Sequence, residues 1–289
     1  MLTVCVPHYN FVNPKLFESL YLQCKAAGVY FEIIIIDDAS TNSKKDYLNN
    51  FKQPEFKIYF LKENIGRSAI RNLLAAKAKY PYLLFLDADA ELINTNFIFN
   101  YLNNLCESIV YGGRIYAKQT PEPNYFLHYK YGSQVEQYAE SQFQSNNFLI
   151  QKAVFSSLVF DDELKGYGYE DVLFGLGAKR LGIALKKIDN PVKHIQLKTN
   201  EEFVKDMEQA LRNLNFLIIK KKDWRLEDEV NVSAVYKKLK RYRVVFLLNY
   251  RLEEILRKSR ELLFLNIPIG ATLLTAVYKL YYFHYLQKR

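Results

Sequence analysis

The sequence predicts an α/β fold, a mostly parallel sheet covered by helices, with a C-terminal helical extension. Short apolar runs alternate with helical patterns over the first hundred residues. Strands buried on both faces of a parallel sheet read as continuous apolar runs, and this alternation is typical of such sheets. The excess of positive over negative charge is confined to the last quarter of the chain, which indicates a separate extension.

The expected elements follow in order. Each strand run is short, apolar and bounded by Pro, Asp or Asn. The strands are residues 2–7, 31–37, 56–61 and 82–87, and the crossover helices are residues 14–27 and 66–79. After Tyr111 the pattern is less regular, and glycines and prolines mark loops. Ligands of such sheets bind beyond the carboxyl ends of the strands.

The charge divides the chain in two. Residues 220–289 hold 16 Lys and Arg against 7 Asp and Glu, whereas residues 1–219 hold 24 of each. We therefore expect a body of residues 1–219 and a basic, amphipathic helical tail of residues 220–289 with an anionic partner. Three cysteines without a CxxC pair and the lack of a signal peptide favour a reducing, cytoplasmic location.

Two of the predicted strands end in paired acids. Asp37 and Asp38 follow "IIII", and Asp87 and Asp89 follow "LLFL". Carboxylates at i and i+2 on an extended exit can reach one hard divalent cation, to which a diphosphate can add further oxygens. The alternative is that these acids cap a strand and the next helix.

Five motifs in order carry a family resemblance: "VCVPHYN", "IIIIDDAS", "ENIGRSAIRN", "FLDADA" and "GYGYEDVLFG". Together they resemble the family 2 glycosyltransferases with the nucleotide-diphosphosugar (GT-A) fold, over roughly residues 1–200. The last motif also resembles galactosyl- and N-acetylgalactosaminyl-transferases and chondroitin-type polymerases. Tyr167 stands where that branch has Trp, and Tyr169 where it has the second of two paired glycines.

The resemblance implies a metal site. Asp89 would be the direct ligand, Asp87 would contact the ribose or a metal-bound water, and His194 would complete the site. Imidazole beside carboxylate oxygens suits Mn²⁺ better than Mg²⁺. A lone His at a strand end is otherwise a surface residue.

The resemblance also implies a donor site for UDP. Asp37 and Asp38 would read the uracil and ribose, because a carboxylate can accept the uracil imide N–H. The alternative is helix-cap chemistry within "DDASTNS". Arg71 would lie by the base or the diphosphate, whereas Arg67 could be a solvated charge. Further donor contacts implied by position are Pro7, Tyr9 and Asn147.

Glu170 and Asp171 answer a separate chemical need. Direct displacement at the anomeric carbon inverts it and requires a base to take the acceptor's hydroxyl proton. In the inverting branch the second acid of this pair is that base, which implies Asp171, with Glu170 holding the acceptor. Without the resemblance, both would be N-terminal helix acids favoured by the macrodipole.

We therefore expect an inverting, metal-dependent glycosyltransferase that moves a hexose or N-acetylhexosamine from a UDP-sugar to a glycan or lipid-linked acceptor in surface polysaccharide synthesis. An Asp-x-Asp phosphatase would need Thr where Glu91 stands. A nucleic-acid binder using the tail would leave the acid-bearing motifs unexplained. A fold that has lost catalysis is the remaining alternative.

The tail combines the basic stretch "KKLKRYR" (237–243) with an apolar, aromatic run at 262–286. Asn266 and Pro268 interrupt the run, so it is too short for a membrane span. We expect an interfacial helix that attaches peripherally to anionic lipid at the inner face of the membrane. The alternative is a helical extension packed on the catalytic domain.

Overall fold

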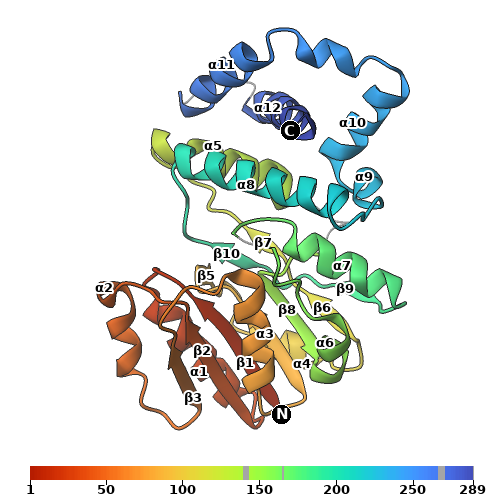
Figure 1. The fold of residues 1–289 in the computed structure, drawn as a ribbon. Helices are drawn as coiled ribbons and strands as arrows, with labels where there is room; N and C mark the ends of the chain where they lie inside the picture. Colours follow the sequence, from red (N-terminus) through yellow and green to blue (C-terminus); the bar gives the residue numbers. More distant parts are fainter. Residues whose placement is uncertain (139–142, 165, 266–270, 289) are drawn as a thin grey trace. The chain divides into compact units, whose positions relative to one another are not determined.

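The computed structural model describes residues 1–138, 143–164, 166–265 and 271–288 (Figure 1). They form two compact units. Unit 1 comprises Met1–Ala117, Gln137–Lys165 and Glu170–Gln196, and unit 2 comprises Lys118–Glu136, Gly166–Tyr169 and Leu197–Arg289. The boundary that we expected at residue 219 falls inside unit 2, because the helix before it packs on the tail helices.

Unit 1 is built on a seven-stranded sheet in the order β3-β2-β1-β4-β8-β6-β9. The first four strands in this order are parallel, whereas β8 runs antiparallel to both β4 and β6. The predicted strands and sheet are confirmed. The strands are β1 (Leu2–His8), β2 (Phe31–Asp37), β3 (Phe56–Phe60), β4 (Tyr82–Leu86), β6 (Ile109–Tyr111), β8 (Asn147–Gln151) and β9 (Leu185–Lys187).

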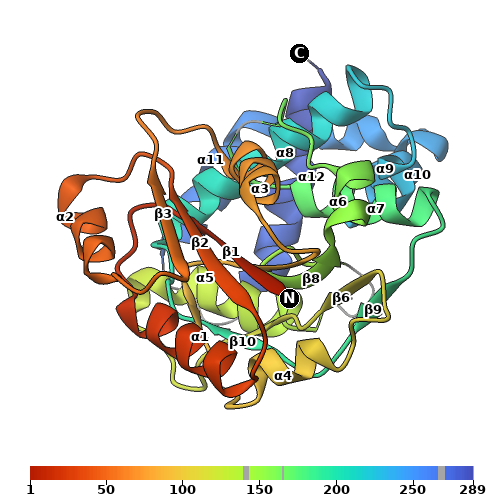
Figure 2. The same ribbon diagram turned by 90° about the horizontal axis from the view of Figure 1, so that it is seen from below.

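Helices cover both faces of this sheet, as Figure 2 shows. One apolar core lies under α1 (Pro14–Ala26) and α4 (Phe97–Leu102). The other lies under α3 (Arg67–Lys77), α6 (Lys152–Leu158) and α7 (Glu170–Arg180). All seven residues of β2 are buried, which explains its unbroken apolar run. The short α2 (Asn42–Lys45) and a 3₁₀ turn, η1 (Asp46–Asn50), lead into β3.

A second, three-stranded sheet has the order β5-β10-β7. Its strands are β5 (Ala90–Glu91), β10 (Val192–His194) and β7 (Arg114–Ile115). The register pairs His194 with Ala90 and Val192 with Arg114. It therefore joins the chain that leaves β4 to a segment a hundred residues later.

Unit 2 is helical. Within it, α12 packs against α5, α8, α10 and α11. A capping box of Thr199 and Glu202 begins α8. The elements are η2 (Pro123–Tyr125), α5 (Phe126–Tyr131), the π-helical turn η3 (Gly132–Glu136), α8 (Asn200–Ile219), α9 (Leu226–Glu229), α10 (Asn231–Arg241), η4 (Val245–Asn249), α11 (Leu252–Phe264) and α12 (Ala271–Gln287).

Part of the apolar run of the tail is packed against other helices rather than exposed to solvent. Tyr278, Tyr282 and Phe283 of α12 are buried, so they are not available at headgroup depth as the interfacial-helix prediction required. The interruption predicted at Asn266 and Pro268 lies outside the described residues. Among the residues that the structure describes, no helix is both long enough and apolar enough to cross a membrane.

Candidate functional site

The ends of β1 and β2 are joined by a buried pair. His8 Nδ1 lies 2.7 Å from Asp37 Oδ1, and both side chains are 0% exposed. The Ser40 backbone N–H donates to Asp37 Oδ2 at 3.0 Å. Burial acts to raise the pKa of Asp37, but the hydrogen bonds from His8 and Ser40 outweigh it and lower that pKa. Asp37 therefore stabilises the adjoining loops as an ion.

Asp38 accepts two hydrogen bonds from the loop that precedes α3. Its Oδ1 accepts from the Ile65 N–H at 2.7 Å, and its Oδ2 accepts from the Gly66 N–H at 3.1 Å. Burial raises the pKa of Asp38, against the effect of these two bonds. Both predicted nucleotide-reading acids thus have defined backbone partners.

Tyr9 lies on the loop beside this frame, and its side chain is 53% exposed. The preceding Pro7 is half-buried. Asn10, whose φ is +51°, donates its backbone N–H to Ser40 Oγ at 2.7 Å and accepts from the Thr41 N–H at 2.9 Å. The loop is therefore held in place while the tyrosine ring stays open to a ligand.

At the end of β4, Asp87 is paired with Arg71. The Arg71 Nη2 donates to Asp87 Oδ1 at 2.8 Å. The guanidinium is almost fully buried, 5.5 Å from the ring centroid of Phe160, whereas Asp87 is 18% exposed. Arg71 therefore orients Asp87, and its buried guanidinium is not exposed to a diphosphate.

Asp89 and His194 come together through the three-stranded sheet. His194 Nδ1 lies 3.4 Å from Asp89 Oδ2, and Asp89 is 21% exposed. Burial acts to raise the pKa of Asp89, but His194, with Arg114 and Arg67, outweighs it and lowers that pKa to about 2. The ring of Tyr116 packs edge-on against His194, with centroids 5.4 Å apart. The spatial pairing that the metal-site prediction needs is present.

The acids at the start of α7 belong to the same unit. Arg67 Nη1 donates to Glu170 Oε1 at 3.3 Å, although the arginine side chain is 42% exposed. Burial and the nearby Glu170 raise the pKa of Asp171 to about 6. Its Oδ1 accepts from the Val172 N–H at 2.8 Å. A carboxylate with this pKa can take a proton near neutral pH.

Arg114 is the residue that sequence reasoning missed. Its charge lowers the pKa of both Asp89 and Asp171, so it lies within electrostatic reach of the two acids. It occupies β7, a two-residue strand without a motif, and only the pairing with β10 indicates its place. Arg67, which could have been a solvated charge, also faces this group through Glu170.

Asn147 does not join this group. Its side chain is fully buried, and its amide nitrogen donates to the carbonyl of Asn190 at 2.9 Å. Its Oδ1 accepts from the Tyr101 hydroxyl at 2.5 Å. A side chain at Gly112 would collide with this set, since its Cβ would lie 2.1 Å from the Asn190 carbonyl oxygen. These contacts join β8 to α4 and to the loop between β9 and β10, so Asn147 has a structural role.

The side chains at Asp89 fit a divalent cation that takes its remaining ligands from a bound diphosphate. One carboxylate and one imidazole face each other, which is a mixed oxygen and nitrogen set. In the described part of the chain, no three or more His, Cys, Asp and Glu side chains are grouped to hold a metal ion by themselves. A cation here would therefore need oxygens from a bound ligand.

The model of the family described as glycosyl transferase family 2 matches residues 3–162. This region contains the β1, β2 and β4 loops with Asp37, Asp38, Asp87 and Asp89, whereas Glu170, Asp171 and His194 lie beyond it. The chain belongs to family 2 of the glycosyltransferases. The match covers more than half of the chain, and it disfavours the phosphatase alternative.

Two curated relatives match the N-terminal region of the chain. The "Putative teichuronic acid biosynthesis glycosyltransferase TuaG" of Bacillus subtilis (strain 168) is 29% identical over 91 residues, which are 31% of this chain and 36% of that protein. An uncharacterized glycosyltransferase of Rickettsia felis is 37% identical over 89 residues, 30% of this chain and 14% of that protein. The chain thus matches well under two thirds of either relative.

Solved structures confirm the GT-A fold. The S. aureus TarS 1–349 complex with UDP has a TM-score of 0.52 at 16% identity, covering 100% of this chain and 92% of that one. The mannosyltransferase PcManGT of Pyrobaculum calidifontis, in complex with GDP-Man and Mn²⁺, has a TM-score of 0.55 at 15% identity, covering 96% and 86%. At these identities the likeness concerns the fold alone.

Proposed function

We propose that this family 2 member is an inverting glycosyltransferase that moves a hexose or N-acetylhexosamine from a UDP-sugar to a glycan or lipid-linked acceptor in surface polysaccharide synthesis. The observation that carries the proposal is the pairing of Asp89 with His194 at 3.4 Å in the unit that also holds Glu170 and Asp171, with Arg67 bonded to Glu170 at 3.3 Å. This arrangement supports a single site that holds both the diphosphate of the donor and the base. The teichuronic acid name of the Bacillus relative supports the polymer class.

The donor would be held by the loops after β1, β2 and β4. Tyr9 offers an exposed ring on which a uracil base can stack. A carboxylate has about four acceptor sites, so the two backbone bonds of Asp38 leave it capacity for the base or ribose, whereas the fully buried Asp37 holds the loops around them. Asp87, oriented by Arg71, is the other ribose candidate. The UDP and UDP-GlcNAc complexes of TarS support this donor class.

Asp89 and His194 would hold the cation, Mn²⁺ or Mg²⁺, which when bound neutralises the charge of the departing diphosphate. Arg67, whose side chain is largely exposed, can add positive charge toward the same group. These residues fix the leaving group and lower the energy of the charge that develops on it.

Asp171 would act as the base. The acceptor oxygen attacks the anomeric carbon, its proton passes to the Asp171 carboxylate, and the bond from that carbon to the diphosphate oxygen breaks to release UDP. Glu170, held by Arg67, would position the acceptor hydroxyl. One displacement inverts the anomeric centre.

The test is Asp171→Asn, which keeps the size and the acceptor for the Val172 N–H. Turnover should fall by about 10²- to 10⁴-fold with UDP affinity near wild type. Wild-type turnover should rise with pH through about 6 and then level off, because only the ionised carboxylate accepts the proton. Asp162→Asn, an exposed acid of unit 1, is the control.

The same substitution tests the electrostatics. The folded-state pKa of Asp171 lies above the ordinary value of 3.8, so its contribution to stability falls as the pH rises through about 6. Asp171→Asn should therefore raise the free energy of unfolding at pH 7 by about 1 kcal/mol or more. Loss of UDP binding with retained turnover would place Asp171 in the donor site instead.

Peripheral attachment to anionic membrane is the proposed location, and it rests on a segment other than α12. Around "KKLKRYR", from the end of α10 to the residue after η4, large apolar side chains are exposed beside the basic ones. They are Tyr242, Phe246, Leu247 and Tyr250, with Trp224 shortly before α9. Exposed aromatic and apolar residues flanked by lysines and arginines suit an anionic lipid surface.

Co-sedimentation with phosphatidylglycerol vesicles tests this location on the full chain. Wild type should pellet at low salt, and Phe246→Ser with Leu247→Ser should reduce the bound fraction about tenfold through the loss of apolar burial. Val277→Ser with Leu273→Ser, also exposed but on α12, is the matched control. Equal loss in both double variants would contradict the assignment to η4.

A further inference from the structure

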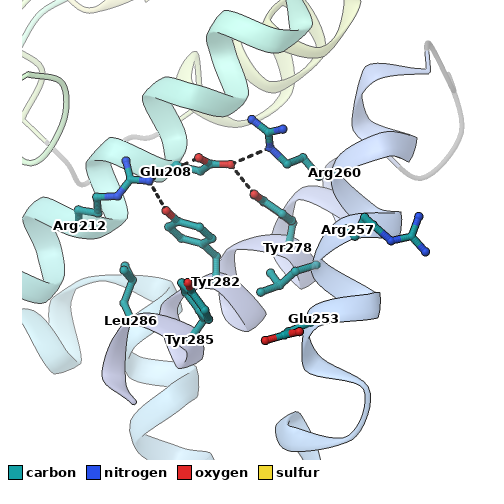
Figure 3. Close-up of a pocket in the computed structure, with 10 residues that line it drawn as sticks. Glu208, Arg212, Glu253, Arg257, Arg260, Tyr278, Tyr282, Tyr285 and Leu286 are labelled. Carbon is teal, nitrogen blue, oxygen red and sulfur yellow. Dashed lines mark hydrogen bonds and ion pairs between the residues drawn. The ribbon is translucent and has the colours of Figure 1, made fainter. Parts of the chain in front are cut away.

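Unit 2 contains a pocket of about 460 Å³ that the proposed transfer reaction does not use. Figure 3 shows it between α8, α11 and α12. Its size falls within the range of about 300–1,000 Å³ that is usual for small-molecule sites. The lining side chains are Glu208, Arg212, Glu253, Leu256, Arg257, Arg260, Tyr278, Tyr282, Tyr285 and Leu286.

The guanidinium groups of this pocket already have carboxylate partners. Glu208 Oε1 accepts from Arg260 Nε at 3.0 Å, and its Oε2 lies 3.7 Å from Arg212 Nη2. Arg257 pairs with Glu261 on its own helix at 3.0 Å. A bare anion would therefore have to compete with carboxylates for every arginine.

Glu253 gives the pocket an acceptor without a partner. Its exposed side chain makes no hydrogen bond or ion pair with any described residue, and Figure 3 shows its carboxylate on the side of Tyr285. A bare cation could pair with it, but three arginines line the same pocket and would repel one. The charges thus disfavour a simple ion of either sign.

The tyrosines add donors and ring surfaces. Tyr282 Oη accepts from Arg212 Nη2, which leaves its own O–H for another acceptor. Burial and Glu208 raise the pKa of Tyr282, so the phenol stays protonated at neutral pH. The rings of Tyr278, Tyr282 and Tyr285 follow one another at centroid distances of 5.8 and 6.0 Å. Tyr278 and Tyr282 are buried and stack on each other, whereas Tyr285 is half-buried, so its ring, beside carboxylate, guanidinium and phenol groups, can pack on the C–H surface of a sugar.

We propose that this pocket binds a neutral saccharide unit of the acceptor glycan, with Glu253 and Tyr282 bonding to its hydroxyls and the half-buried ring of Tyr285 packing on the sugar ring. The identification of the saccharide with the acceptor rests on the proposed transferase function. A second point of attachment would raise the local concentration of a polymeric acceptor without any new contact at the reacting end.

The test measures binding of maltotetraose, cellotetraose and chitotetraose to the full chain by calorimetry and saturation-transfer NMR, without nucleotide or metal. At least one should bind with a dissociation constant of about 1 mM. Glu253→Ala should weaken it about tenfold. Glu254→Ala is the matched control, because it removes the same charge from the same first turn of α11 but lies outside the pocket.

Tyr285→Leu keeps an apolar side chain and removes the ring, and it should also weaken binding about tenfold. No binding by any of the three probes would overturn the proposal, as would equal affinity in the two glutamate variants. Displacement by inorganic phosphate or tetramethylammonium would instead identify an ion site. Saccharide binding in a protein that transfers no sugar would reject the transferase function and leave the pocket standing.

Discussion

The carboxyl ends of β2 and β4 carry the same kind of sequence signal and have different surroundings. Both strands are apolar and buried, and each is followed by two aspartates. Asp37 is 0% exposed and bound to His8 and Ser40, whereas Asp89 is 21% exposed and faces His194. The comparison teaches that paired acids at a strand exit can be buried anchors of loops or remain partly open to solvent, depending on what packs beside them.

Asp89→Asn should give the largest effect at the open end. Transfer should fall by about 10²- to 10³-fold because the metal's stabilisation of the leaving group is lost. UDP affinity should become the same in Mn²⁺ and in EDTA, measured by calorimetry. Glu91→Gln, on the exposed side of β5, is the control. A wild-type protein that binds UDP equally in both conditions would refute the metal site.

Asp37→Asn should affect stability at the closed end. It removes the carboxylate from His8 and Ser40, and the free energy of unfolding should fall by about 2 kcal/mol in urea titrations at pH 7. Because the folded-state pKa of Asp37 lies below 3.8, this stabilisation is complete above 3.8 and is lost as the pH falls through the folded value. The difference in the free energy of unfolding between Asp37→Asn and wild type should therefore narrow as the pH falls. A difference that stays the same at every pH would mean that the substitution removes packing rather than charge.

Arg71→Lys should give a smaller effect, because it changes only how Asp87, the first acid after β4, is oriented. A lysine cannot reproduce the planar contact to Asp87 over the Phe160 ring. We expect kcat/KM to fall about tenfold, mainly through KM for the UDP-sugar, in steady-state kinetics. An unchanged KM with a lower kcat would show that Arg71 acts on the transition state.

The loop before α7 shows how local geometry explains a departure from the family pattern. Tyr169 has a φ of +69°, in the region where glycine is the usual residue. Gly168 has a φ of +104°, and a Cβ there would lie 2.4 Å from the Ala210 Cβ. Asn213 donates to the carbonyls of Tyr167 and Gly168. A positive φ, which glycine adopts most readily, is thus adopted at position 169 by a tyrosine.

The sequence by itself determined the four strands β1 to β4, the two acid pairs and the order of the motifs, because the alternation of apolar runs and the residues at strand ends are local properties. The tertiary structure decided which acids are open, since that depends on partners such as His8, Arg71 and His194, which lie 16 to 105 positions away from them. It also brought Arg114 and Arg67 to the site, and it buried the tyrosines of α12 that the apolar pattern had offered to a membrane. Side-chain burial is a property of the packed chain, and no stretch of residues specifies it alone.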